Sequence, residues 1–311
     1  MTKKIALLFS GQGAQAVGMG KDLAAAYPSI AALVTKADGI LGRDLSRIMF
    51  EGPEEELTKT ANCQPALYVH GIACLTGLRE ELGDFPVAAA AGLSLGEFTA
   101  HAAAGTFDFE SGLRLVAARS QFMQEACEAT TGAMAAMIGA EEGVVRELAA
   151  EADVDVSNLN TPGQVVISGD AAKISLAVAL SKERGIRRAT LLNVAGAYHS
   201  RLMESAYLKL GPVLQAQTFS PPAFPVVCNV DALPVSEPEK IRDTLHEQVT
   251  GTVRWAQSIE YLAGHLHIER FLELGPGGVI AGMVGRIRKD ADVLSISDTA
   301  SLRAVAAILK S

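Results

Sequence analysis

The chain has 311 residues, of which 49% are hydrophobic, so it is long and apolar enough to bury a substantial core. Its formal net charge of −8 argues against nucleic acid and anionic membrane surfaces as the main partners. The four cysteines form no Cys-x-x-Cys pair, and no uncharged stretch is long enough to span a bilayer. We therefore expect a soluble, cytoplasmic protein in a reducing compartment, with neither a disulfide framework nor a zinc site.

The first predicted strand covers residues 5–9 and leads into a glycine-rich loop at 10–15. The glycine spacing fits neither the dinucleotide fingerprint nor the Walker pattern, so phosphate binding is not indicated. Gln12 lies between Gly11 and Gly13, which would let its backbone N–H face a reacting centre. A simple strand-to-helix turn is the alternative, and the loop alone does not decide between them.

Helices are expected next over 22–41 and 64–82, with a short helical turn at 53–57. Pro65 would then stand in the first turn of its helix, where its missing N–H costs nothing. His70, in the same helix, is interpreted as a packed or surface histidine and not as a ligand.

A short apolar strand at 87–91 is followed by a Gly-x-Ser-x-Gly motif at 92–96 and then by a helix over 97–104. This order is the context of a nucleophile elbow, in which a sharp turn exposes the serine, here Ser94. The N–H groups at the start of the helix can hold a negative oxygen, and Leu95, directly after the serine, is the expected donor. A glycine-lined turn with an ordinary capping serine is the alternative.

Two polar residues of the helix that follows have an ordinary explanation. Glu97 and His101 are four residues apart, and the spacing is not that of a zinc-binding His-Glu-x-x-His motif. We interpret them as a polar contact along one helix face.

The helix expected over 110–126 carries an arginine on its apolar face. Arg119 lies four residues after Leu115 and three before Phe122, in line with the apolar stripe. A guanidinium stays charged when buried, so it needs an anion beside it. That anion is either an internal carboxylate or the carboxylate of a substrate, and the spacing leaves both open.

Residues 130–197 predict a separate unit in the order strand, helix, strand, strand, helix, strand. This β-α-β-β-α-β order is typical of the ferredoxin-like fold. The strands are expected at 133–138, 154–159, 165–168 and 188–194, and the helices at 141–152 and 171–184. We therefore predict an α/β protein in which this unit is inserted into a larger domain made of residues 1–129 and 198–311.

The chain re-enters the larger domain through a glycine-flanked loop with His199, ahead of a helix expected to end near residue 217. The positive end of a helix disfavours imidazolium, which would keep the ring neutral and able to accept a proton. A capping or packing histidine is the alternative. Later elements are expected as strands at 224–230 and 270–274 and a helix at 241–249, which contains Gln248.

Six motifs together resemble the malonyl-CoA:acyl carrier protein transacylases of type II fatty acid synthesis. They are GQGAQ at 11–15, GLSLGE at 92–97, RSQFMQEA at 119–126, NTPGQ at 160–164, GAYHS at 196–200 and LELGPG at 272–277. The resemblance covers nearly the whole chain in order. It implies an α/β-hydrolase-like large domain with a ferredoxin-like insertion, which agrees with the pattern of elements above.

By this resemblance Ser94 would take malonyl from coenzyme A as an ester, and His199 would act as base and then as acid for the leaving thiol. The backbone N–H groups of Gln12 and Leu95 would form the oxyanion hole. Arg119 would hold the malonyl carboxylate.

The resemblance also implies that the backbone carbonyl of Gln248 orients the histidine, which gives a dyad and not a Ser-His-Asp triad. Asn160 and Tyr198 would contact the substrate. The acyl group would pass to the phosphopantetheine thiol of an acyl carrier protein. No cofactor or metal is implied, because malonyl-CoA is a substrate, and a monomer is expected.

Three positions depart from the commonest family pattern. Leu93 stands where many members have histidine, and Ser10 where proline is usual. Tyr198 occupies a position often filled by phenylalanine. An aromatic ring there would crowd the substrate α-carbon, which suggests malonyl over methylmalonyl.

Two other functions remain open at this point. An acyltransferase serving a polyketide-type synthase would share all these residues, and a serine thioesterase or esterase would share the elbow. Acidic carrier proteins are expected to need a basic docking face on this acidic chain. The densest basic cluster before the site is Lys182, Arg184, Arg187 and Arg188, for which a solvated surface is the alternative.

Overall fold

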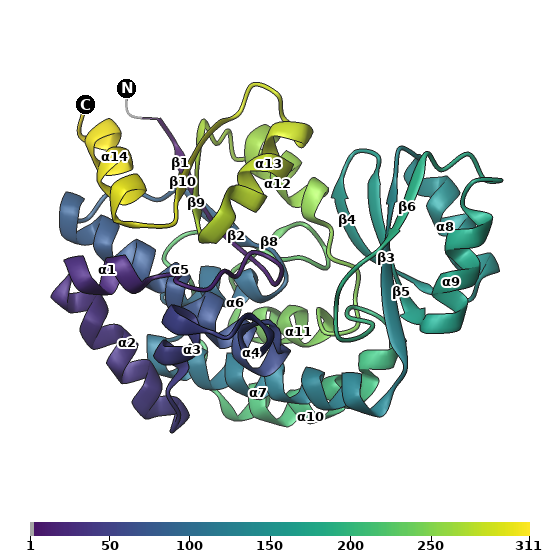
Figure 1. The fold of residues 1–311 in the computed structure, drawn as a ribbon. Helices are drawn as coiled ribbons and strands as arrows, with labels where there is room; N and C mark the ends of the chain where they lie inside the picture. The colour runs from purple at the N-terminus through teal and green to yellow at the C-terminus, as the bar shows by residue number, and fades with distance from the viewer. Residues whose placement is uncertain (1–2) are drawn as a thin grey trace.

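The computed structural model describes residues 3–311, which form a large and a small body, each with its own β-sheet (Figure 1). The strands of the large body are β1 (Ile5–Phe9), β2 (Ala89–Gly92), β7 (Val226–Val227), β8 (Pro234–Val235), β9 (Arg270–Leu274) and β10 (Asp292–Ile296). They form a six-stranded sheet in the order β10-β9-β1-β2-β7-β8, in which only the β7–β8 pair is antiparallel. Parallel neighbours need long crossovers, and helices supply them.

Helices cover both faces of this sheet, because successive strand residues point to opposite sides. Leu7 and Phe9 of β1 belong to the larger apolar cluster, whereas Ala6 and Leu8 belong to a second cluster with Trp255. The helices are α1 (Lys21–Ala26), α2 (Pro28–Leu41), α3 (Leu45–Glu51), α4 (Glu54–Thr58), α5 (Thr60–Leu82), α6 (Leu95–Ala103), α7 (Phe109–Ala129), α10 (Glu204–Ala216), α11 (Pro238–Glu247), α12 (Trp255–Gly264), α13 (Val279–Ile287) and α14 (Thr299–Lys310), with 3₁₀ turns η1 (Arg201–Met203) and η2 (Pro276–Gly278).

The small body is an antiparallel sheet with two helices on its outer face (Figure 1). Its elements are β3 (Gly132–Ile138), α8 (Glu142–Glu151), β4 (Asp155–Thr161), β5 (Gln164–Asp170), α9 (Ala171–Leu180) and β6 (Arg188–Leu191), and the strand order is β4-β5-β3-β6. The edge strand β4 joins the two bodies. Leu159 N–H donates to the Val253 carbonyl at 2.9 Å, and Val253 N–H donates to the Ser157 carbonyl at 2.8 Å.

The predicted α/β class is confirmed, and β1 and β9 have the predicted bounds. The single helix predicted over 22–41 is wrong, because Pro28 ends one helix and starts the next. The predicted start of the 64–82 helix is also wrong, since α5 begins at Thr60 and holds Pro65 in its interior. The carbonyl of Ala61, which an N–H at position 65 would normally bond, accepts from Nη2 of Arg43 at 2.6 Å.

Other predicted bounds need correction near the end of the chain. The strand predicted at 224–230 contains only the two residues of β7, and Gln248 follows α11 as its C-cap. The helix expected after His199 starts with the 3₁₀ turn η1. The sequence patterns did not predict α3, α12, α14, β8 or β10. Within residues 3–311, every helix is too short or too polar to cross a membrane.

Candidate active site

Ser94 occupies a sharp turn between β2 and α6, with φ 52° and ψ −105°. Positive φ is unusual for a residue with a side chain, so the surroundings must hold this conformation. The flanking glycines are required by close approach. A Cβ on Gly92 would lie 1.8 Å from the carbonyl carbon of Gly96, and one on Gly96 would lie 2.2 Å from the carbonyl oxygen of Phe9. This is the geometry of the predicted elbow.

Two side-chain amides hold the Ser94 backbone from both sides. Its N–H donates to Oδ1 of Asn229 at 2.7 Å, and its carbonyl accepts from Nε2 of Gln248 at 2.9 Å. Asn229 also donates to the carbonyl of Gly92 at 2.8 Å. These contacts keep the turn in its strained conformation and leave the hydroxyl free to point into the site.

The Ser94 hydroxyl oxygen lies 2.7 Å from Nε2 of His199. Nδ1 of the same ring lies 2.8 Å from the backbone carbonyl of Gln248. A carbonyl only accepts, so Nδ1 must carry the proton, and Nε2 is left as an acceptor for the serine proton. The pair can therefore act as nucleophile and base, with a backbone carbonyl in the place that a carboxylate takes in a triad.

The sequence analysis attributes a neutral His199 to the positive end of the helix that follows, and this explanation is wrong. The turn that follows is only the three-residue η1, and the side chain of Ser200 caps it by accepting from Leu202 N–H at 3.2 Å. Burial, and next the positive charge of Arg119, lower the pKa of His199 to about 4. The ring is neutral at pH 7 because it is desolvated beside a cation.

Arg119 is 1% exposed, and its guanidinium reaches the nucleophile. Nη2 donates to the Ser94 hydroxyl at 3.1 Å and to Oε1 of Gln248 at 2.9 Å, while Nη1 donates to Oε1 of Gln64. Within the described part of the chain, no carboxylate lies within ion-pair distance of this guanidinium. Burial lowers the pKa of Arg119 to about 10, so it remains charged at pH 7. Of the two possibilities left open by the sequence, the structure favours a ligand carboxylate.

The N–H groups of Gln12 and Leu95 are the predicted oxyanion donors. Across residues 3–311, neither donates a hydrogen bond to another protein group. The Gln12 loop lies against the elbow, since a Cβ on Gly11 would be 2.4 Å from the carbonyl oxygen of Leu93. Both residues line the same cavity as Ser94, so their N–H groups are available to a developing negative oxygen there.

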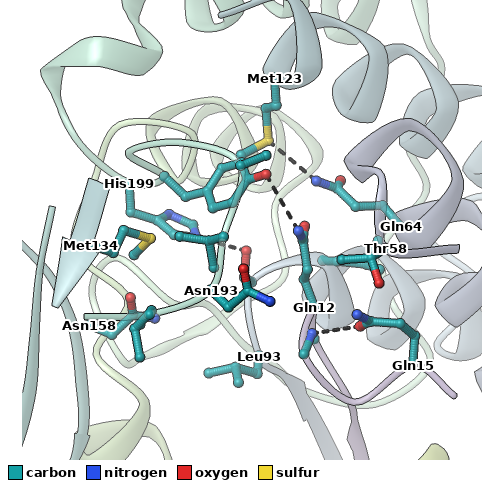
Figure 2. Close-up of a pocket in the computed structure, with 18 of the residues that line it drawn as sticks. Gln12, Gln15, Thr58, Gln64, Leu93, Met123, Met134, Asn158, Asn193 and His199 are labelled. Atoms are coloured by element: carbon teal, nitrogen blue, oxygen red, sulfur yellow. Dashed lines mark hydrogen bonds between the residues drawn. The ribbon is translucent and has the colours of Figure 1, made fainter. Parts of the chain in front are cut away.

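The site opens into a cavity of about 430 Å³ between the two bodies (Figure 2). Figure 2 shows Gln12 and Gln64 on the side of the large body, facing Met134 and Asn158 of the small body. Tyr198 also lines it, and its hydroxyl contacts Oγ1 of Thr60 and lies 3.4 Å from Nε2 of Gln12. Polar residues from the small body are Asn158, Asn160 and Asn193.

The predicted Asn160 therefore lines the cavity, and its Oδ1 is buried without a hydrogen-bond partner in the described structure. An amide oxygen without a partner suits a ligand N–H. Within residues 3–311, no cluster of three or more His, Cys, Asp or Glu is arranged to hold a metal ion.

The interpretation of Glu97 and His101 as partners on a helix face is wrong. Oε2 of Glu97 accepts from Asn229 N–H at 3.0 Å and from Nε2 of Gln248 at 2.6 Å. His101 instead contacts Oγ1 of Thr106 at 3.0 Å. Glu97 thus lies beneath the elbow, where the sequence analysis did not place it.

Asn229, Gln64 and Asn158 were also missed. Asn229 had a usable signal, because it follows a strand next to β2, and the carboxyl ends of parallel strands meet at one edge. Gln64 lies far from the elbow in sequence and reaches it through the packing of α5 against α6 and α7.

The basic cluster Lys182, Arg184, Arg187 and Arg188 is exposed and runs from the turn after α9 to the first residue of β6, outside the cavity lining. Arg184 is ion-paired with Glu151, and Nε of Arg188 donates to Oγ1 of Thr190 at 3.0 Å. The free charge of the cluster is therefore carried mainly by Lys182, Arg187 and Arg188.

Known proteins with similar sequences and structures identify the family of this chain. The sequence matches the acyl transferase domain family over residues 6–289. It is 40% identical to a malonyl CoA-acyl carrier protein transacylase of Bacillus subtilis, over 99% of this chain and 98% of the relative. It is also 40% identical to the polyketide biosynthesis malonyl CoA-acyl carrier protein transacylase PksC of the same organism, over 93% of this chain and 99% of that relative.

A solved structure of a type II PKS acyl-carrier protein in complex with its malonyl-transacylase is similar to this chain, with a TM-score of 0.94 and 38% identity. The alignment covers 98% of this chain and 99% of that one. Family match, identity and fold agree over nearly the full length, so the chain belongs to the acyl transferase family.

Proposed function

We propose that the protein transfers a malonyl group from malonyl-CoA to the phosphopantetheine thiol of an acyl carrier protein, supplying fatty acid elongation. The observation that carries this proposal is the position of Arg119. Its guanidinium is 3.1 Å from the Ser94 hydroxyl and has no carboxylate partner in the described residues. A malonyl thioester carries a free carboxylate one methylene away from its reacting carbonyl, so it can meet both groups at once.

Acyl transfer would proceed through a malonyl-serine ester. Nε2 of His199 takes the proton as the Ser94 oxygen attacks the thioester carbon, and the carbonyl oxygen becomes an oxyanion facing the N–H groups of Gln12 and Leu95. Collapse of this intermediate breaks the C–S bond, and the coenzyme A sulfur leaves with the proton from His199. The carrier thiol then repeats the sequence in reverse, so the kinetics are ping-pong.

Intact-mass measurement after incubation with malonyl-CoA tests this function. The protein should gain one malonyl group, and Ser94→Ala should gain none. Acetyl-CoA is the matched control, because it keeps the thioester and lacks the carboxylate. Equal acylation by both donors, or malonylation of Ser94→Ala, would contradict the proposal.

The second candidate for the acceptor is the carrier protein of a polyketide-type synthase. The resemblance to PksC and to the solved carrier complex supports this candidate. The relative without the polyketide designation is matched over 99% of this chain, against 93% for PksC, at equal identity. Transfer rates to fatty acid and polyketide carrier proteins, measured side by side, separate the two.

A serine thioesterase or esterase would use water in the second step. It has no need of a buried cation beside the nucleophile, which argues against it here. The lifetime of the malonyl-enzyme without a carrier distinguishes them, since a transferase keeps the ester until a thiol arrives.

We further propose that the large body, residues 1–129 and 198–311, is α/β-hydrolase-like, and that residues 130–197 form a ferredoxin-like insertion. Supporting this, the small sheet has the order β6-β3-β5-β4, which is fourth, first, third, second in chain order. The nucleophile follows a parallel strand at the centre of the large sheet, as an elbow requires.

The exposed cluster Lys182, Arg184, Arg187 and Arg188 is our proposed docking face for the carrier protein. Surface charges mainly steer association, so this face would raise the rate of encounter with an acidic carrier.

We also propose a monomer that needs no cofactor, because the nucleophile, base and oxyanion donors all come from one chain. We propose a cytoplasmic location for it as well.

A further inference from the structure

Glu97 is a fully buried carboxylate one residue beyond the elbow motif, on the first turn of α6. Its Oε2 accepts from Asn229 N–H at 3.0 Å and from Nε2 of Gln248 at 2.6 Å. Its Oε1 has no partner in the described structure. Burial raises the pKa of Glu97 to about 7, so the group is a carboxylate above neutral pH. A buried carboxylate is costly without strong partners, so its position needs an explanation.

The two residues that Glu97 binds are the two that hold the Ser94 backbone. Asn229 accepts from the Ser94 N–H at 2.7 Å, and Gln248 donates to the Ser94 carbonyl at 2.9 Å. The N–H and the carbonyl of Ser94, the residue with positive φ, are therefore held by the side chains of two residues that contact one carboxylate. Asn229 contacts Glu97 through its backbone N–H, and Gln248 does so through its side-chain amide. A strained conformation persists only where its surroundings over-determine it.

Glu97 is also linked to the cation of the site. Nε2 of Gln248 faces the Glu97 carboxylate, while Oε1 of the same amide accepts from Nη2 of Arg119 at 2.9 Å. The negative and positive groups thus contact opposite ends of one side-chain amide. This order fixes the amide orientation, because its NH₂ must face the carboxylate and its oxygen the guanidinium.

We propose that Glu97 is a positioning residue for acyl transfer: through Asn229 and Gln248 it fixes the Ser94 backbone, and across the Gln248 amide its negative charge acts on Arg119 without contacting it. The inference rests on the proposed malonyl transfer. The negative charge of Glu97 weakens the attraction between Arg119 and the substrate carboxylate. At the same time Glu97 holds the nucleophile in place.

Glu97→Gln tests this role in assays at about pH 8 or above, where wild-type Glu97 is ionised, since it removes the charge and keeps the shape. Hydrogen bonds to a charged group are stronger, so the elbow loosens, and kcat per active site should fall about tenfold or more. The negative charge near Arg119 is lost as well, so the guanidinium should attract the malonyl carboxylate more strongly, and KM for malonyl-CoA should fall. Acetyl-CoA has no carboxylate, and its KM should stay within about twofold of the wild-type value.

The matched control is Glu273→Gln. Glu273 is also fully buried and accepts from the N–H groups of Ile280 and Ala281, at 2.8 and 3.2 Å, away from the cavity. It should lower the melting temperature and leave kcat and KM per active site unchanged. Active sites are counted as the fraction of protein that becomes malonylated.

A Glu97→Gln enzyme that resembles this control, with lower stability and unchanged kcat and KM, would overturn the inference. If Glu97→Gln does not fold, Gln248→Ala removes the amide bridge and keeps the backbone carbonyl at His199; unchanged kcat in that variant would overturn it equally. Failure of the wild-type protein to accept malonyl at Ser94 would instead sink the proposed function.

Discussion

Arg119 and His199 meet at one atom: the Ser94 hydroxyl oxygen lies 3.1 Å from Nη2 of the arginine and 2.7 Å from Nε2 of the histidine. The cation that would bind the substrate carboxylate thus also acts on the base. Its charge helps to lower the pKa of His199. Substrate selection and base strength are coupled through this arrangement.

Arg119→Ala should lower kcat/KM for malonyl-CoA by about a hundredfold, which corresponds to roughly 3 kcal/mol for a lost buried charged contact. A monocarboxylic acyl-CoA should lose much less, and hydrolysis of it should increase, because the guanidinium beside Ser94 is then absent. Both are measured as rates of acyl-enzyme formation and decay.

Arg114→Ala is the control on the same helix. Arg114 is exposed and pairs with Glu110 at 3.0 Å, a surface contact expected to contribute less than about 1 kcal/mol. Undiminished malonyl transfer by Arg119→Ala would refute the role of the guanidinium.

The pH dependence of acylation follows from the lowered pKa of His199. The base must be neutral, and its pKa of about 4 in place of 6.5 keeps His199 neutral from pH 7 down to about pH 5 and protonates it near pH 4. Burial raises the pKa of Glu97 to about 7, so protonation of that carboxylate should lower kcat at an earlier stage of the acid titration. A bound malonyl carboxylate offsets the charge of Arg119, so the pKa of His199 should rise in the complex. The acidic limb of kcat should therefore lie at higher pH than that of kcat/KM.

Rapid acylation after a pH jump, at low and at saturating malonyl-CoA, measures the two limbs. In the Glu97→Gln enzyme, which lacks the Glu97 titration, an acidic limb of kcat/KM near pH 6.5 would show that burial does not hold the His199 ring neutral. With acetyl-CoA the two limbs should coincide, because that substrate leaves the Arg119 charge uncompensated.

Much of the site was predictable because its signals are local. The elbow is specified by two glycines and a serine within five residues, and Arg119 by its place on an apolar stripe. The role of Gln248 came from the resemblance alone. Its backbone carbonyl, 2.8 Å from Nδ1 of His199, leaves no trace in residue type.

The remaining features depend on contacts between residues far apart in sequence. Glu97 was assigned to a helix face because helical spacing pairs it with His101, whereas its actual partner Asn229 is 132 residues away. The start of α5 was misplaced because a proline signals a first turn, and the compensating donor to Ala61 comes from Arg43 in another element. Local patterns carry no information on such compensation.

Tyr198 should control the size of the acyl group through its ring and not through its hydroxyl. Tyr198→Phe removes the contacts with Thr60 and Gln12, so the transition state for malonyl transfer should lose about 1 kcal/mol or less, which lowers kcat/KM for malonyl-CoA by about fivefold at most. The preference of the enzyme for malonyl-CoA over methylmalonyl-CoA should not change. Tyr198→Ala should reduce that preference. Competition between the two donors measures it, and an unchanged preference in Tyr198→Ala would remove Tyr198 from acyl selection.

The docking face is tested by reversing two of its exposed charges. Arg187→Glu/Arg188→Glu should raise KM for the carrier protein by about tenfold and leave acylation by malonyl-CoA within about twofold, because neither residue lines the cavity. Lys21→Glu/Lys289→Glu makes the same change in net charge at exposed positions outside the small body. If this control weakens carrier use equally, the effect is one of net charge. If the Arg187/Arg188 variant impairs both half-reactions equally, these arginines do not form a carrier-specific surface.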